Sequence, residues 1–147
     1  MNHPPSLQAD SAPDIKITRG NLRRLDSLLA SHAGEWSWRA VEYLARELMR
    51  STVVDDREIP ANTVTMRSRV EFRAEGIGVR QVATLVYPGE SGLYDDAISI
   101  LTPVGAALIG LAEGQSISYA MRGGKPATIS VTQMLYQPEA SRRVRLL

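Results

Sequence analysis

The sequence predicts an α+β fold, in which a short N-terminal antiparallel helical hairpin precedes an antiparallel β-sheet that carries one short helix. Apolar side chains recur at helical spacing over residues 18–31 and again over 37–50. After Pro60 the period of the apolar residues changes to two, which is typical of strands. Because the helical patterns come first and the strand patterns follow, helices and sheet are expected in separate layers, as in the α+β class.

Composition excludes several classes of protein. The chain has 147 residues, of which 44% are hydrophobic and 22% charged, as expected for one globular domain with a small appendage. A net charge of +1 argues against strong electrostatic binding of bare nucleic acid, and leaves open only a weak contact. The absence of cysteine excludes disulfides, thiolate metal sites and a cysteine nucleophile. No apolar run approaches the roughly 18 residues of a membrane span, and the first residues lack a signal-peptide core. We therefore expect a cytoplasmic protein with no membrane contact.

The N-terminal part predicts a tail and a helical hairpin. Residues 1–14 are rich in Pro, Ser and Ala without a hydrophobic period, which indicates a disordered tail. Thr18 is a suitable cap for the first helix and Ser37 for the second. Two helices of similar length joined by a short loop form an antiparallel hairpin, which we place at residues 15–54. The apolar stripe of the second helix consists of Trp38, Val41, Leu44, Ala45 and Leu48.

The sheet begins after a charged segment that ends in a proline, residues 55–62, which predicts a linker. The first strand is expected over 63–72, because apolar and polar residues alternate there. The polar side chains of its wet face are Thr63, Thr65, Arg67, Arg69 and Glu71. A second strand over 79–87 is apolar on both sides over 82–86, which indicates a central position.

The later strands are predicted in the same way. Residues 97–101 form a third strand that leads into the short helix. Residues 116–121 and 127–136 predict a hairpin across Gly123-Gly124, because glycine tolerates the positive φ of a tight turn. Residues 141–147 carry three arginines and predict a basic tail.

The run from Thr102 to Gly110 predicts the short helix and its surroundings. Thr102 can cap the helix with its hydroxyl, and Pro103 suits the first helical position because its missing N–H would have no partner there. Gly110 is suited to the left-handed conformation that ends a helix. A helix this short is unstable alone in water, so we expect it to lie against the sheet. Its start is then a rigid corner without reactive groups, which favours docking over catalysis.

Candidate catalytic and metal-binding groups are sparse. The two histidines, His3 and His32, fall in the tail and in the hairpin loop, without the partners that a metal site or a catalytic triad needs. The carboxylates of residues 55–58 could bind a divalent cation, but a charged linker beside a proline is the commoner explanation. The glycines around Gly110 lack the Lys-Ser/Thr pair of a phosphate-binding loop. We therefore expect no catalytic residue, no metal ion and no cofactor.

Four arginines remain as a candidate anion-binding set. They are Arg67, Arg69, Arg73 and Arg80, which could line one wet face of the sheet and hold phosphates. A strand face of mixed arginine, threonine and glutamate is more often simply solvated. Both interpretations stay open.

Four segments together resemble the GreA/GreB family of transcript-cleavage factors. The segments are TVTMRSRVEF at 63–72, TLVYP at 84–88, TPVGAALIG at 102–110 and YQPEA at 136–140. Their order and spacing extend the resemblance over residues 15–140. The resemblance implies an FKBP-like C-terminal domain over 63–140, preceded by a short coiled-coil hairpin. It also implies binding to RNA polymerase near the mouth of the secondary channel.

The resemblance further implies a partner-binding site at the start of the short helix. In Gre factors this turn has an acidic-Ser-Pro sequence, which touches the tip of the coiled coil of the β′ subunit. The three positions correspond to Leu101, Thr102 and Pro103 here, and Val104 completes the implied site. Leu101 departs from the acidic pattern.

A second departure concerns catalysis. Gre factors resemble one another in a long hairpin, whose acidic tip helps to hold a catalytic Mg²⁺ in the polymerase active site. Each expected helix here has about 13 residues and so spans about 20 Å. The tip residues are His32, Gly34, Glu35 and Trp36, with a single carboxylate among them. Since Mg²⁺ is held by one or two carboxylates together with substrate phosphates, a single one is a poor ligand set. We therefore predict a monomeric, non-enzymatic regulator of transcription that does not stimulate transcript cleavage.

The alternative function is that of an FKBP-like peptidyl-prolyl isomerase or chaperone module. Such a module needs an apolar pocket lined by aromatic side chains. Phe72 is the only phenylalanine of the chain, and the expected sheet has few other aromatic residues.

Overall fold

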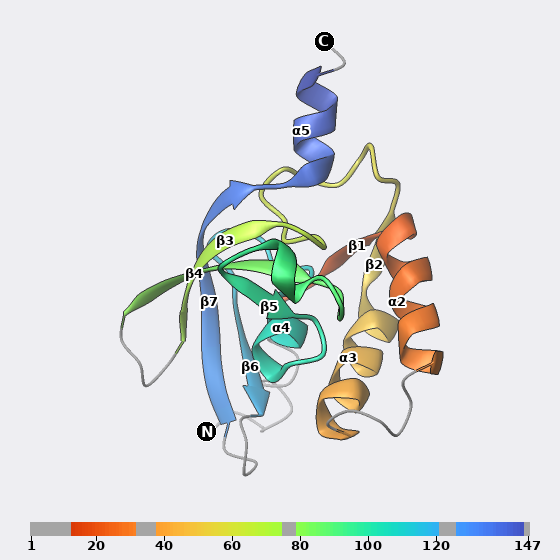
Figure 1. Cartoon of the computed structure of the whole chain (residues 1–147), viewed down its shortest axis with the longest axis vertical. Helices are drawn as coiled ribbons and strands as arrows, with labels where there is room; N and C mark the ends of the chain where they lie inside the picture. The colour runs from red at the N-terminus through yellow and green to blue at the C-terminus, as the bar shows by residue number, and fades with distance from the viewer. Residues whose placement is uncertain (1–12, 32–37, 75–78, 121–125, 146–147) are drawn as a thin grey trace, which may run out of the picture.

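The computed structural model describes residues 13–31, 38–74, 79–120 and 126–145. The elements follow one another as β1 (Lys16–Thr18), α2 (Arg19–Ser31), α3 (Trp38–Arg50), β2 (Thr52–Val54), β3 (Arg69–Ala74), β4 (Arg80–Val86), the 3-10 turn η1 (Ser91–Leu93), β5 (Ala97–Ser99), α4 (Pro103–Leu108), β6 (Ser116–Ala120), β7 (Pro126–Tyr136) and α5 (Pro138–Arg145). A twisted sheet stands beside α2 and α3, and α5 projects away from it (Figure 1). Within the described ranges, no helix is long and apolar enough to cross a membrane.

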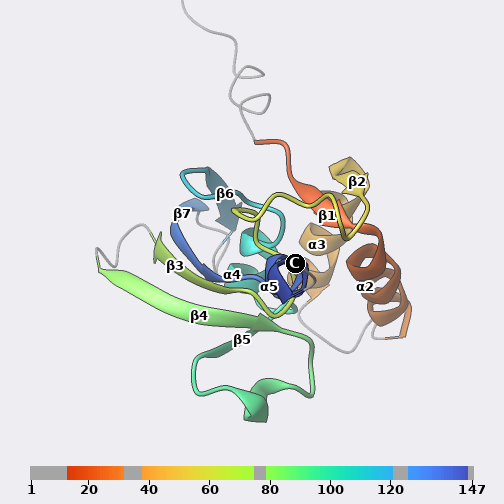
Figure 2. The ribbon, with the colours of Figure 1, turned by 90° about the horizontal axis from the view of Figure 1, so that it is seen from above.

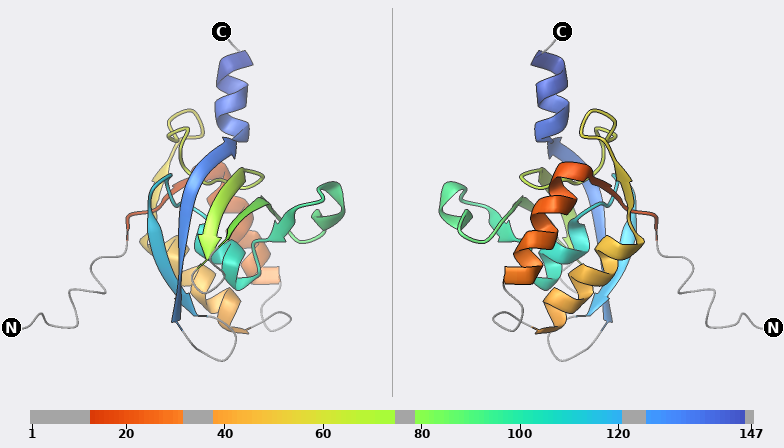
Figure 3. Two further views of the ribbon diagram at one scale, coloured as in Figure 1. Left: turned by 90° about the vertical axis from the view of Figure 1, so that its left-hand side faces the viewer. Right: turned by 90° about the vertical axis from the view of Figure 1, so that its right-hand side faces the viewer.

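The main sheet is mixed and has the strand order β5-β4-β3-β7-β6. The pairs β3–β4, β3–β7 and β6–β7 are antiparallel, as predicted, but β4 and β5 are parallel, so the prediction of an entirely antiparallel sheet is wrong. The reason lies in the connection between β4 and β5, which leaves the sheet as a protruding loop with η1 (Figures 2 and 3). This loop carries the chain back, so that Ala97 at the start of β5 pairs with Thr84 in β4.

The two N-terminal helices begin and end close to their predicted limits. The hydroxyl of Thr18 accepts a hydrogen bond of 3.0 Å from the backbone N–H of Asn21, which confirms the predicted cap. Helices α2 and α3 lie next to each other on one side of the molecule (Figures 1 and 2). Their apolar faces contribute Leu25, Leu44 and Leu48 to the core. Ser37, the predicted cap of the second helix, lies outside the described residues.

A small parallel pair of strands, absent from the prediction, flanks these helices. Lys16 in β1 pairs with Thr52 in β2, and Thr18 pairs with Val54. Each strand has three residues, which is too short for a period-two pattern to be recognised. The pair brings together the two ends of the helical segment, and Ile15 just before β1 is fully buried.

The predicted strand over residues 63–72 is correct only in its second half, since β3 begins at Arg69. The segment before it lies outside the sheet and pairs with the chain after α4. The N–H of Val64 donates to Leu111 O, and its carbonyl oxygen accepts from the N–H of Gly110. Thr63 and Thr65, predicted on a wet face, are 2% and 1% exposed. The chain then turns at Arg67, which has a φ of +67°. The alternation of polar and apolar residues over 63–72 therefore covers two different structures, a buried segment outside the sheet and the strand β3 that begins at Arg69.

One hydrophobic core joins the helices to the sheet. Its buried members include Leu25 and Leu44 from the helices, Phe72 and Ile129 from the sheet, and Leu108 from α4. Since the same cluster contains residues from both parts of the chain, α2 and α3 are held against the sheet by apolar burial rather than by each other alone.

The end of the chain is a helix where a basic tail was predicted. Pro138 occupies the first position of α5, and the side-chain oxygen of Gln137 accepts a hydrogen bond of 3.1 Å from Ala140 N. The amide nitrogen of Gln137 donates to Pro60 O and Thr63 O, at 2.8 and 2.7 Å. The guanidinium group of Arg143 donates to backbone oxygens of the predicted linker. The eight residues of this helix include three arginines and only two apolar side chains after Pro138, which is too few for a helical period to be recognised in the sequence.

Candidate partner-binding surface

The corner between β5 and α4 is built by a chain of short hydrogen bonds. The carbonyl oxygen of Ser99, the last residue of β5, accepts from the N–H of Thr102 at 3.1 Å and from its hydroxyl at 2.7 Å. The same hydroxyl accepts from the N–H of Gly105 at 3.0 Å, and Pro103 is the first residue of α4. The predicted cap and the predicted role of proline are both confirmed. The corner is therefore held by hydrogen bonds among Ser99, Thr102 and Gly105, two of which use the Thr102 hydroxyl.

Gly105 allows α4 to lie directly on the end of β5. A Cβ atom at this position would be 2.1 Å from the carbonyl oxygen of Ser99, far inside any normal contact. Gly105 is buried, as are Ala106, Ala107 and Leu108. The short helix is thus covered along most of its length, and only its start reaches the surface.

The four residues predicted to bind a partner differ in exposure. Thr102, Pro103 and Val104 are half-buried, so each offers part of its side chain to the surface. Leu101 is 4% exposed and belongs to the hydrophobic core. The side chain of Leu101 therefore faces inward, and only its three successors offer side-chain surface at this corner.

A charged and aromatic cluster ties α2 to the sheet near this corner. The guanidinium carbon of Arg24 lies 4.0 Å from the centroid of the Tyr87 ring, and that of Arg67 lies at 5.5 Å. The carboxylate of Glu90 receives hydrogen bonds from Arg67 and, at 3.2 Å, from the backbone N–H of Tyr87. Arg24 is a second cation, 3.8 Å from Glu90. This cluster, Arg24, Arg67, Tyr87 and Glu90, is called the arginine–tyrosine cluster below.

Electrostatics in the arginine–tyrosine cluster favour the charged forms of Glu90 and Arg67. The hydrogen bond from Arg67 is the largest cause that lowers the pKa of Glu90, and partial burial opposes it. Burial raises the pKa of Tyr87, whereas the neighbouring Arg24 and Arg67 oppose that rise. The sequence does not predict this cluster, because its members come from different elements and carry no shared motif.

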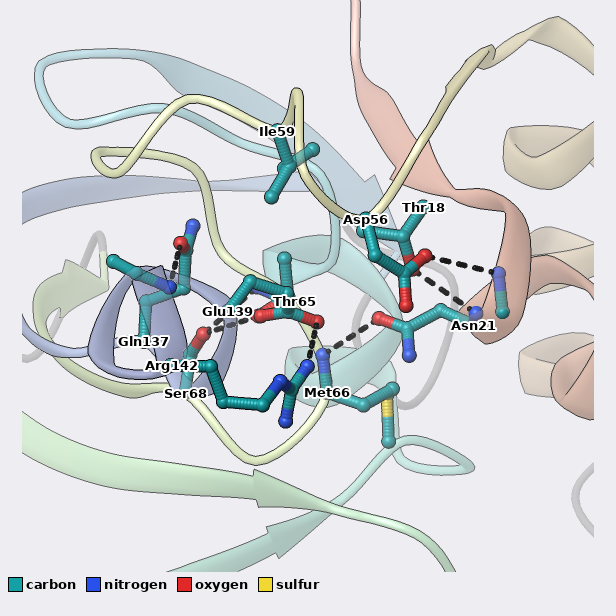
Figure 4. A network of polar contacts seen from close by, with 12 residues as sticks. Thr18, Asn21, Asp56, Ile59, Thr65, Met66, Ser68, Gln137, Glu139 and Arg142 are labelled. Atoms are coloured by element: carbon teal, nitrogen blue, oxygen red, sulfur yellow. Dashed lines mark hydrogen bonds and ion pairs between the residues drawn. The ribbon is translucent and has the colours of Figure 1, made fainter. Parts of the chain in front are cut away.

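A network of polar contacts extends from α2 to α5 (Figure 4). The Asn21 side-chain oxygen accepts a hydrogen bond of 3.1 Å from the N–H of Met66. Next to Met66, the Thr65 hydroxyl donates to the buried Glu139 of α5 at 2.7 Å, and Ser68 is 2.9 Å from the same hydroxyl. The turn before β3 is therefore held from both sides.

Most of the candidate anion-binding arginines are paired with acids. Arg67 contacts Glu90, Arg69 donates to Asp96 at 2.8 Å, and Arg80 lies 3.9 Å from Glu71. Their positive charge is thus compensated within the protein, which favours the solvated face over a phosphate-binding one.

Other candidates from the sequence do not come together as a site. The tip residues His32, Gly34, Glu35 and Trp36 and the turn glycines Gly123 and Gly124 lie outside the described residues. In the part of the chain that the structure describes, no group of three or more His, Asp or Glu side chains could hold a metal ion. Asp55, Asp56 and Glu58 do not come together as such a group.

Comparisons with known proteins agree with the resemblance. A family model described as "Transcription elongation factor, GreA/GreB, C-term" matches residues 44–136. The regulator of nucleoside diphosphate kinase from Escherichia coli K12 is 38% identical over 133 residues, which are 89% of this chain and 96% of the relative. The protein of the same name from Shigella flexneri matches equally well.

A solved structure extends the agreement to the fold. The prokaryotic transcription elongation factor GreA/GreB from Nitrosomonas europaea is 37% identical, covers 84% of this chain and 100% of its own, and superposes with a TM-score of 0.66. The chain belongs to the GreA/GreB family of transcription elongation factors.

Proposed function

We propose that this protein binds RNA polymerase near the mouth of its secondary channel and regulates transcription without stimulating transcript cleavage. Membership of the GreA/GreB family supports the choice of partner. The corner formed by Thr102, Pro103 and Val104 supplies the docking surface, directed at the coiled coil of the β′ subunit. Its rigidity supports this role, since a surface already held in place loses little conformational freedom on binding.

The proposal that the protein does not stimulate transcript cleavage rests on the packing of α2 and α3. Each helix has 13 residues, which corresponds to about 20 Å. Leu25, Leu44 and Leu48 bury the apolar faces of both helices in the core of the sheet domain. Helices that are this short and lie against the body of the protein do not extend far from it. They would occupy the entrance of a channel rather than its depth.

The names of the curated relatives concern the regulation of nucleoside diphosphate kinase. For this chain we propose that any such effect is indirect and acts through transcription. A direct effect would require binding to the kinase, which a pull-down with the purified kinase distinguishes from binding to polymerase.

The proposal is tested by the affinity of the full-length protein for core RNA polymerase. Pro103→Ala changes the docking corner, and Pro138→Ala is a matched control, because both prolines are the first residue of a helix. We expect weaker binding for Pro103→Ala than for the wild type and unchanged binding for Pro138→Ala. Equal affinities of the wild type, Pro103→Ala and Pro138→Ala would show that the interface lies elsewhere on the protein. No binding by the wild type would refute the proposal.

The second half of the proposal needs an assay with backtracked polymerase. We expect no release of short RNA on addition of the protein, although an authentic cleavage factor releases it in parallel. Release of short RNA by this protein would refute the non-catalytic role.

The isomerase alternative receives no support from the described surface. A cleft beside β4 is lined by charged side chains and two tyrosines, which is unlike the apolar pocket that a prolyl ring needs.

A further inference from the structure

We infer that a cleft over the inner strands β3, β4 and β7 of the sheet is a receptor for a basic side chain, arginine or lysine, of the partner protein. The cleft has a volume of about 300 Å³. Its lining consists of Arg67, Arg69, Thr84, Tyr94, Asp95, Asp96 and Tyr136. The inference rests on the proposed function, because it takes RNA polymerase as the source of the basic side chain. It is independent of the corner at Thr102, which it does not need.

Sheet register explains why these residues meet. Arg69 in β3 pairs with Thr84 in β4 on one side and with Tyr136 in β7 on the other. Tyr94, Asp95 and Asp96 come from the protruding loop that precedes β5 (Figure 2). The cleft therefore lies across three neighbouring strands and is bordered by one loop.

The cleft and the docking corner lie at opposite ends of β5. Asp96 immediately precedes this strand. Thr102 lies just after it, in a turn in which the carbonyl oxygen of Ser99 accepts a hydrogen bond from the Thr102 N–H. A strand of three residues is about 10 Å long, so one partner surface can reach both places. In addition, β5 is an edge strand of the main sheet, which leaves its outer side unoccupied by any other described strand.

Charge decides which kind of ligand fits. The Nε of Arg69 donates to Asp96 at 2.8 Å, and the Thr84 hydroxyl donates to the same carboxylate at 2.9 Å. Arg67 is paired with Glu90. Asp95 is exposed, and no ion pair involving it occurs among the described residues. Asp95 is thus the one charged side chain lining the cleft that forms no ion pair with a described residue.

The two tyrosines complete a cation site. Tyr94 is 38% exposed and Tyr136 is 47% exposed, so part of each ring is available to a ligand. Cations are attracted to the faces of aromatic rings, and a guanidinium group also stacks on them. The protein itself uses this contact a short distance away, where Arg24 lies over the ring of Tyr87. A phosphate would meet the opposite conditions, because Arg67 and Arg69 are already paired and Asp95 would repel it.

The experiment compares variants of the full-length protein in direct binding to core RNA polymerase at low and at moderate salt. Asp95→Asn removes the unpaired carboxylate, and Asp55→Asn is the matched control, since Asp55 is also exposed and without an ion pair in the described ranges. We expect Asp95→Asn to raise the Kd by about three- to tenfold and Asp55→Asn to leave it unchanged. The difference should shrink as salt screens the pair.

Two further variants separate this site from a general effect. Tyr94→Leu should weaken binding to a similar degree, whereas Leu93→Ala, at a neighbouring and more exposed residue, should not. Equal affinities of Asp95→Asn and Asp55→Asn, with normal binding by the wild type, would refute the role of the cleft as a receptor for a basic side chain. The proposed function would remain intact. Tighter binding by Asp95→Asn would indicate an anionic ligand and would also refute this role of the cleft. Failure of the wild type to bind would instead refute the proposed function itself.

Discussion

The guanidinium group of Arg24 lies over the ring of Tyr87, with its carbon 4.0 Å from the ring centroid. Arg24 belongs to α2, and Tyr87 directly follows β4, so this contact joins the helical part of the chain to the sheet. Glu90 lies beside both residues and accepts hydrogen bonds from Arg67. The orientation of α2 relative to the docking corner thus depends on a polar cluster as well as on the apolar core.

Removal of the cation over Tyr87 should weaken this connection. Arg24→Met keeps most of the aliphatic stem but removes the charge, and we expect the free energy of unfolding to fall by about 0.5–1 kcal/mol. Arg23→Met is the matched control, because the neighbouring Arg23 is exposed on the same helix and forms no ion pair or ring contact with a described residue. Urea denaturation of both variants provides the measurement. Equal losses in the two would show that the ring contact contributes nothing.

The carboxylate of Glu90 should make the protein sensitive to acid. Its pKa in the folded protein lies below the ordinary value of 4.5, mainly because Arg67 donates a hydrogen bond to it. A carboxylate with a lowered pKa stabilises the folded state above its ordinary pKa, and that contribution is lost as the pH falls through the folded value. We therefore expect the free energy of unfolding to decrease below about pH 4.5.

The test of this acid sensitivity is the pH dependence of unfolding in Glu90→Gln. This variant should be less stable than the wild type at neutral pH and should lose less stability on acidification. Glu42→Gln is the control, since Glu42 is exposed on α3 and has no ion pair among the described residues. If the curves of wild type and Glu90→Gln remained parallel between pH 3 and pH 6, a range of about one to two units around the ordinary carboxylate pKa, the assignment would be wrong.

Gly105 should tolerate no side chain. A Cβ atom would lie 2.1 Å from the carbonyl oxygen of Ser99, and a backbone atom cannot move aside as a flexible side chain could. We expect Gly105→Ala to reduce the free energy of unfolding by about 2–3 kcal/mol and to displace the start of α4. Gly92→Ala is the control, because a Cβ atom at Gly92 would have nothing within 4 Å. Thermal unfolding followed by circular dichroism distinguishes them, and similar midpoints would contradict the close approach.

The local structure of the corner between β5 and α4 was predictable from sequence because its determinants are local. Thr102, Pro103 and Gly110 each act within one turn of the chain, so residue type alone indicates a cap, a first helical position and a left-handed end. The strand over 63–72 was half wrong because Thr65 finds its partner in Glu139, far along the chain. No local pattern contains that information.

The remaining parts of the candidate site depend on tertiary structure in the same way. The contact between Arg24 and Tyr87 and the cleft around Asp95 form only after distant strands and loops have met. The inward direction of Leu101 also follows from tertiary packing, since its side chain joins the hydrophobic core. The family resemblance assigned this position to the docking turn, and no local pattern distinguishes a leucine in that turn that faces outward from one that is buried.

Gly110 and Gly114 allow backbone strain to be separated from a steric clash. Both have a positive φ, +84° and +89°, so alanine is strained at either position. At Gly110, however, a Cβ would also lie 2.7 Å from the Cβ of Ile15, whereas nothing lies within 4 Å of one at Gly114. We expect Gly114→Ala to cost about 1–2 kcal/mol and Gly110→Ala to cost at least about 1 kcal/mol more.

The location of this extra cost can be measured as well as its size. Gly110 O accepts a hydrogen bond of 3.3 Å from the N–H of Lys16, which is the first residue of β1. A side chain at Gly110 would push Ile15 away and so loosen the small β1–β2 pair, which Ile15 precedes. Amide hydrogen exchange in Gly110→Ala should therefore accelerate in β1 and β2 more than in β6 and β7, whereas Gly114→Ala should leave β1 protected. Uniform acceleration in both variants would mean that the first strand is not held by its contact with Gly110.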